Sequence, residues 1–360
     1  MDYLDELYEL IDEAKQLDHG DVQISLLEQA VRLADANNDI ETAFEARNEL
    51  IEACIFGGDA LKAIIEFTWI LGKYKQFPLE FNIYDVLVGY KWILPQLYDF
   101  INIPLSKINE LFEDYKDMML HDNCDLRFFY QAKCLLAVKG LDSNNVDEYY
   151  NKWMSTPSDE YSDCAACELD MQIEYHLYKK DYEKALEIFK PILSGKLKCG
   201  EIPHLTYSRF LLPLVRMGNY KLALEYESKD YKLIYKNKEF INEISNSIIC
   251  LSILNIDKAV ERFTKHYDWH IKSKDDFHKF RFNLASWFLF EKIKLNNINE
   301  ITLNIPEITS VFSDNGRYQV EELICHFKAI TTEIAGKFDV RNCNTYFKDY
   351  IDYTFELLTI

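Results

Sequence analysis

Lys180-Asp181-Tyr182-Glu183-Lys184-Ala185, with Phe189 four residues further on, is a pattern that this chain repeats. Each copy has a polar turn and then an alanine, and most copies place an aromatic residue one helical turn later. The other copies are Gly58-Asp59-Ala60 with Ala63 and Phe67, Gly218-Asn219-Tyr220 with Ala223, and Asn255-Ile256 with Ala259 and Phe263. The last three alanines lie 38 and 36 residues apart. A period in the thirties with helical patterning predicts stacked helix–turn–helix repeats.

The composition is consistent with a large helical protein. Hydrophobic residues make up 48% of the 360 residues, which excludes a disordered chain. With 11 glycines and 8 prolines, the chain has too few turn residues for a sandwich or barrel. A solenoid of this length needs no single large core, because each repeat packs only on its neighbours. We therefore expect an all-α fold without a sheet, an α-solenoid superhelix of antiparallel helix hairpins.

Helical spacing of apolar residues predicts the organisation of the chain. Residues 1–37 form an N-terminal helical cap, and residues 38–360 form one continuous superhelix whose clearest repeats span 163–271. The expected helix pairs are 40–56 with 60–74, 84–98 with 105–120, 126–139 with 146–154, 165–178 with 182–193, 205–217 with 220–235, 239–253 with 257–271, and 317–336 with 342–358. A long helix is expected at 276–295, and residues 296–314 have no clear pattern.

The recurring alanines and aromatics resemble those of tetratricopeptide repeats. In that family a small residue packs near the turn between two antiparallel helices, and an aromatic residue wedges between repeats. Residues 163–267 show the resemblance most clearly, and residues 153–231 also resemble a group of uncharacterised bacterial repeat proteins. The chain differs from the family in the first helices, where Ile51, Ile173 and Leu211 stand at positions of Gly or Ala. The resemblance implies a protein that binds a protein or peptide segment on its inner surface.

The charge of the chain bears on its partners and location. The formal net charge of −20 disfavours nucleic acid and anionic membranes as partners. The first 52 residues hold fifteen acidic and three basic residues, whereas residues 172–238 hold thirteen basic and eight acidic ones. The acidic opening of the chain does not resemble a signal peptide. Its longest apolar stretch, 84–105, is interrupted by charges and a proline. We expect a cytoplasmic protein with reduced thiols.

The main functional hypothesis is a non-enzymatic adaptor. The chain has no P-loop, dinucleotide-binding, zinc-protease or serine-hydrolase motif. If the family register holds, the inner-facing positions that contact a partner are Glu45, Asn48, Glu52, Asp170, Glu174, Tyr178, Ser208 and Arg216. The acidic positions near the N-terminus favour a partner with a basic segment.

Two other hypotheses remain open. The first is a peptide-switched bacterial regulator that acts on another protein, since peptide-pheromone receptors are repeat superhelices of similar length. The second is a thiol redox enzyme that uses Cys164 and Cys167, although the strand–helix context typical of such motifs is missing.

One group of residues has the types and spacing of a zinc site. Cys164 and Cys167 begin an expected helix, Cys199 follows its partner helix, and His204 comes five residues later. Antiparallel pairing should bring these residues together at the open end of one hairpin, with His204 entering from the next repeat. Three thiolates and an imidazole suit one tetrahedral structural zinc ion. Ordinary packing of free cysteines is the competing interpretation.

Overall fold

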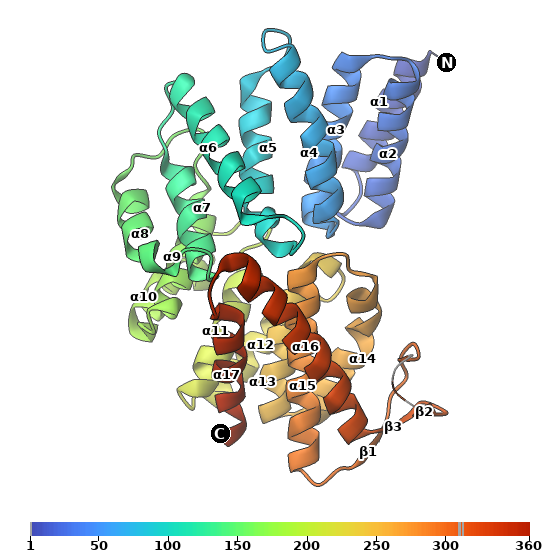
Figure 1. Cartoon of the computed structure of the whole chain (residues 1–360), viewed down its shortest axis with the longest axis vertical. Helices are drawn as coiled ribbons and strands as arrows, with labels where there is room; N and C mark the ends of the chain where they lie inside the picture. Colours follow the sequence, from blue (N-terminus) through green and yellow to red (C-terminus); the bar gives the residue numbers. More distant parts are fainter. Residues whose placement is uncertain (1, 309–310, 312) are drawn as a thin grey trace. The chain divides into compact units, whose positions relative to one another are not determined.

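The computed structural model describes residues 2–308, 311 and 313–360, which form seventeen α-helices and three short strands. Their contacts group into two compact units, and each is described by itself (Figure 1). The first comprises residues 1–129, 156–161 and 237–239, and the second comprises residues 130–155, 162–236 and 240–360. Within the described residues, no helix is both long enough and apolar enough to cross a bilayer.

The first unit is a row of helices, each packed on the next. It contains α1 (Tyr3–Lys15), α2 (Asp21–Ala36), α3 (Ile40–Gly57), α4 (Ala60–Gln76), α5 (Ile83–Gln96), α6 (Leu105–His121) and the first turn of α7 (Arg127–Val138). Helices α1 and α2, the expected cap, pack in this row with α3. Two ion pairs of the buried Arg47 help to hold it, because its guanidinium binds Asp35 at 2.7 Å and Glu66 at 2.9 Å.

The second unit holds the rest of the helical pairs. It contains most of α7, α8 (Val146–Ser155), α9 (Ala165–Tyr178), α10 (Tyr182–Leu193), α11 (His204–Arg216), α12 (Tyr220–Ile234), α13 (Ile241–Leu254), α14 (Ile256–Lys272), α15 (Asp276–Leu295), α16 (Val320–Asn342) and α17 (Tyr346–Phe355). Helices α9 and α10, α11 and α12, and α13 and α14 pack as pairs, and α11, α13 and α15 also pack in succession. The expected pairing is confirmed for these three pairs and for α16 with α17.

The repeated alanines lie at the helix contacts, as their small size requires. Ala63, Ala185, Ala223 and Ala259 are all fully buried. The polar turn before them also has a common geometry, because Gly58, Lys180 and Gly218 have positive φ. The next residue caps the helix, and the Asp59 and Asp181 side chains accept hydrogen bonds from backbone N–H groups in the first turn. The repeated pattern is therefore a left-handed turn residue, a cap and a close helix contact.

The expectation that the chain has no sheet is wrong. Strands β1 (Glu300–Thr302), β2 (Ser313–Asp314) and β3 (Arg317–Gln319) form a small antiparallel sheet in the order β1-β3-β2. The turn between β2 and β3 is Asn315-Gly316, with φ of 54° and 80°. Positive φ at both positions matches the hairpin turn for which Asn-Gly is the strongest signal. Helix α16 consequently begins at Val320 and not at Arg317, which pairs with Thr302 in the sheet.

Substitution of Ala185 tests the close helix contact. We expect Ala185→Leu to lower the free energy of unfolding by about 1–3 kcal/mol, because the larger side chain overpacks a filled site. Ala329→Leu, at an exposed position of α16, is the matched control and should change it little. Urea unfolding of both variants measures the effect, and equal stabilities would contradict the contact.

Candidate metal centre

Three cysteines from two segments of the second unit meet at one point. Cys164 is the N-cap residue of α9, where its side chain makes no capping hydrogen bond. Cys167 lies one turn further along the same face of that helix. Cys199 stands between α10 and α11, in a loop closed by a hydrogen bond from its own N–H to the carbonyl of Ile202. The predicted convergence of these three residues is confirmed.

The sulfur atoms are close enough to share one ligand. All three lie within 4.8 Å of one another, and the Cys167 and Cys199 sulfurs are 3.2 Å apart. With Zn–S bonds of about 2.3 Å, sulfurs on one zinc ion are separated by less than twice that length. Cys164 is exposed and the other two are partly exposed, so the group is open to solvent. We call Cys164, Cys167 and Cys199 the three-thiol centre.

Hydrogen bonds favour one thiolate in the centre. The Cys167 and Cys199 sulfurs share a hydrogen bond in which either can be the donor. This bond, with backbone N–H groups of Glu201 and Ile202, lowers the pKa of Cys199. The pKa of Cys167 is raised in turn, first by its hydrogen bond to Cys199 and then by burial. When one of the two cysteines is a thiolate, the remaining proton is therefore shared between the Cys167 and Cys199 sulfurs. A metal cation binds thiolates by displacing such protons.

His204, the fourth predicted ligand, is not brought into this group of ligand atoms. It begins α11, where it is buried, and its ring packs edge-on against Phe240 with centroids 4.8 Å apart. Burial lowers the pKa of His204 to about 4, so the ring is neutral at physiological pH. In this arrangement His204 packs the start of α11, and the three sulfurs leave a fourth coordination position to water or another ligand.

Two carboxyl groups of the second unit are shielded from solvent and have raised pKa values. The pKa of Glu201 is raised to about 7, mainly by burial and then by the charges of Glu243 and Cys199. Asp230 of α12 is fully buried, and neither of its carboxyl oxygens has a hydrogen-bond partner. Burial raises the pKa of Asp230 well above its usual value, and Glu243 and Glu227 add to the effect. Burial therefore favours the protonated form of Asp230 in the folded state.

Two of the predicted partner-binding residues belong to a buried ionic network. Asp170, 1% exposed, accepts hydrogen bonds from Thr206 at 2.7 Å and from Nε of Arg209 at 2.9 Å. The Nη1 atom of Arg209 also lies 2.7 Å from Glu174. Arg209 was not predicted from the sequence. The signal that pointed to a basic partner was the pair of acidic residues Asp170 and Glu174, one turn apart on α9. The network ties α9 to α11 beside the three-thiol centre.

The other predicted partner-binding residues of the second unit also contact the chain itself. Ser208 is buried and accepts a hydrogen bond from Asn246 of α13 at 3.1 Å. The Arg216 guanidinium stacks 3.5 Å from the ring centre of Tyr353 and pairs with Glu356 at 3.2 Å. Tyr178 stays partly exposed, close enough to interact electrostatically with Tyr346.

Helix α17 supplies most of these contacts. Tyr346 at its start packs on Gly140, where a Cβ atom would lie 2.2 Å from the tyrosine ring. Gly140 also has a φ of +94°, so both space and backbone conformation require glycine there. Further along, Tyr350 accepts a hydrogen bond from Arg281 of α15. The face that carries Glu174, Tyr178 and Arg216 therefore holds a helix of the same chain.

The predicted positions in the first unit are more open. Glu45 and Glu52 are exposed on α3 and Asn48 is half-buried. Glu45 accepts a hydrogen bond from Tyr8 of α1 at 3.0 Å. Burial, followed by the charge of Glu49, raises the pKa of Glu52. These three residues lie on a solvent-accessible acidic surface.

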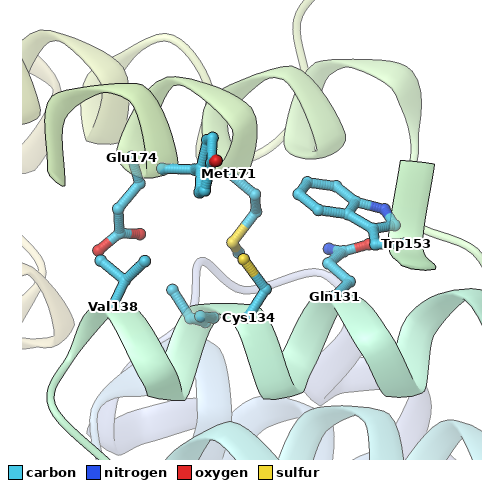
Figure 2. A pocket seen from close by; sticks show the side chains of 8 residues that line it. Gln131, Cys134, Val138, Trp153, Met171 and Glu174 are labelled. Carbon is cyan, nitrogen blue, oxygen red and sulfur yellow. The ribbon is translucent and has the colours of Figure 1, made fainter. Parts of the chain in front are cut away.

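Figure 2 shows a small pocket between α7, α8 and α9 of the second unit. The sulfur atoms of Cys134 and Met171 point toward one another in it, and Glu174 and Trp153 lie at opposite ends. Its cavity volume of about 10 Å³ suits roughly one water molecule. The pocket is a packing gap, too small for an organic ligand.

Comparison with protein-family models and with curated protein sequences finds no match for this chain. The resemblance to tetratricopeptide repeats stays a prediction that rests on the recurring alanine and aromatic residues.

The buried acid Asp230 predicts a dependence of stability on pH. The folded state holds this proton more tightly than the unfolded chain, whose Asp pKa is about 3.9. Its contribution to stability is therefore fully present below that value and is lost as pH rises through the raised folded pKa. Asp230→Asn should flatten this part of the curve. Urea unfolding between acidic and neutral pH, with the exposed Asp257→Asn as control, measures the slopes. Identical slopes for Asp230→Asn and the wild type would contradict the assignment.

Proposed function

We propose that this protein binds one thiophilic metal ion at the three-thiol centre, with zinc as the expected ion. The observation that carries the proposal is the approach of three sulfurs to within 4.8 Å. Thiolates prefer zinc, copper(I) and iron–sulfur clusters to harder cations such as magnesium or calcium. Zinc accepts three protein sulfurs and a fourth ligand from solvent or a neighbouring side chain.

The expected role of the ion is structural. Cys164 and Cys167 belong to the first turn of α9, whereas Cys199 belongs to the loop that leads into α11. An ion bound to all three would fix the start of one helix to the start of the next pair. It would act at the same place as the ion pairs of Asp170 and Arg209, which join α9 to α11.

Metal content tests this proposal directly. Protein purified without chelator should hold about one zinc per chain by elemental analysis, and the zinc should be lost on acidification, because the sulfurs must be deprotonated to bind. Cys167→Ser removes a direct ligand of the proposed zinc ion. It should therefore weaken zinc binding by more than the roughly 10- to 100-fold that follows loss of a residue that only hydrogen-bonds to a ligand. Cys325→Ser, at an exposed cysteine elsewhere, is the matched control.

His204→Phe separates the centre seen here from the four-ligand site expected from the sequence. A phenyl ring can keep the packing on Phe240, so zinc content should be unchanged. Zinc loss as large as that of Cys167→Ser would assign His204 to the ion. A zinc content far below one per chain in the wild type would reject the metal.

A second proposed function is the binding of a protein or peptide segment by an α-solenoid adaptor. It is favoured by one specific observation: Arg216 already contacts the C-terminal segment of the chain, through Tyr353 of α17 and through Glu356, which follows that helix. Glu174 also interacts electrostatically with Tyr346 at the start of α17. We extend this to Glu45, Asn48 and Glu52 of the first unit, where the two carboxylates suit a basic partner segment. A peptide-switched regulator would use the same surfaces and would also change conformation on binding.

The dependence of binding on salt tests the adaptor proposal. A Lys- and Arg-rich helical peptide should bind the full chain more weakly as ionic strength rises, because exposed charges are screened over about 8 Å at physiological salt. Glu45→Gln and Glu52→Gln should each cost about 0.2–1 kcal/mol of binding free energy. Glu333→Gln, at an exposed position of α16, is the control. Calorimetric titrations that give one affinity for all variants and salt concentrations would remove these charges from the proposal.

A further inference from the structure

We infer that Cys167 and Cys199 form an oxidisable pair, which a low-molecular-weight disulfide converts into a disulfide bond with release of the metal ion. The bond formation rests on the sulfur geometry alone. The release of the ion rests on the proposed metal-binding function.

The pair stands out from the other cysteines by proximity and access. Its sulfurs are 3.2 Å apart, a separation that must close by little more than 1 Å to reach the roughly 2.05 Å of a disulfide. Cys54, Cys134 and Cys250 are buried and so less accessible to an oxidant. Among the described residues, the three-thiol centre is the group of three possible ligand atoms that lie within 4.8 Å of one another. The pair expected from the sequence was Cys164 with Cys167. The structure instead places Cys167 against a cysteine from the next loop.

Backbone position favours this cross-link. Cys167 is held in the first turn of α9, and Cys199 belongs to the short loop before α11, outside any helix. A loop residue can move toward a helical one with little change to packed structure.

The chemistry needs a disulfide oxidant such as oxidised glutathione. One thiolate of the pair attacks a sulfur of the oxidant, forming a mixed disulfide and expelling one glutathione thiolate. The second cysteine loses its proton and attacks the protein sulfur of that mixed disulfide, expelling the other glutathione thiolate. Two protein thiols lose two electrons and two protons in total, and the oxidant becomes two glutathione thiols.

The disulfide and the metal-bound centre exclude one another. A bound ion uses thiolate charge on all three sulfurs, and oxidation removes that charge from two of them. The remaining thiol, Cys164, is exposed and its sulfur is within 4.8 Å of both partners. Reduced glutathione reopens the bond: one glutathione thiolate attacks a sulfur of the Cys167–Cys199 disulfide, and a second attacks the glutathione sulfur of the resulting mixed disulfide, so that two protein thiols and one oxidised glutathione form.

Linkage mapping of the full chain tests the inference. Chelator-treated and zinc-loaded protein is incubated with oxidised glutathione, quenched with acid, alkylated, digested and analysed by mass spectrometry. We expect a linked peptide pair containing Cys167 and Cys199, with Cys164 alkylated. In the loaded sample, a chromophoric zinc indicator should report up to one zinc released per disulfide formed. Cys199→Ser should abolish the linked pair, and Cys325→Ser should leave it unchanged.

The two proposals fail separately. Glutathione adducts on Cys164 alone, or a bond between Cys164 and Cys167, would overturn the oxidisable pair even if the protein holds zinc. A Cys167–Cys199 bond in protein that never binds zinc would support the pair and reject the metal function. The wild-type linkage map needs no variant, so a misfolded Cys199→Ser protein would not obscure the result.

Discussion

Two helices approach closely only where the side chain between them is small, and this constraint recurs along the chain. Ala63, Ala185, Ala223 and Ala259 are fully buried at such contacts. Aromatic residues one turn further on fill the space beside three of them, and Phe189 packs on Phe210 of the next pair with ring centres 5.1 Å apart. The alanine brings two helices of a pair together, and the aromatic joins that pair to the next.

Besides apolar packing, hydrogen bonds and ion pairs of buried charged side chains fix how neighbouring helices are placed. Asp170 is almost inaccessible, so its carboxylate requires the hydrogen bonds that Thr206 and Arg209 provide. Removal of one member of a buried ion pair typically costs about 3–5 kcal/mol, since the other charge is left without a partner. The relative positions of α9 and α11 are thus specified by polar contacts as well as by volume. Cys164 and Cys167, at the start of α9, and Cys199, in the loop that leads into α11, lie at the ends of these same elements.

Metal binding and oxidation are two uses of one local arrangement. Sulfurs close enough to share an ion are also close enough to react with one another, and the redox state of the surroundings selects between these outcomes. At this site the N-terminus of α9 and the loop before α11 meet where a cation or an oxidant can reach the sulfurs from solvent.

Local sequence information determined the helices and the first links between them. Helical periodicity, capping residues and small alanines act within a few residues, so the pairs from α3 to α14 were predicted with boundaries that differ from the observed ones by at most a few residues. Hairpin geometry also predicted that Cys164, Cys167 and Cys199 converge. The Asn315-Gly316 turn was a local signal for the small sheet, although the weak pattern around it concealed the strands.

Only the tertiary structure decided contacts between elements distant in sequence. Whether His204 faces the sulfurs or Phe240 depends on how α11 is rotated, which its own periodicity leaves open. Asp170, Ser208 and Arg216 were predicted to face a partner. In the folded chain they instead contact side chains of other elements, namely Arg209, Asn246 and Tyr353. Likewise, the pairing of Cys167 with Cys199 follows from the path of a loop. Spacing along the sequence predicts which side chains share one helix face, whereas packing of the folded chain determines what that face contacts.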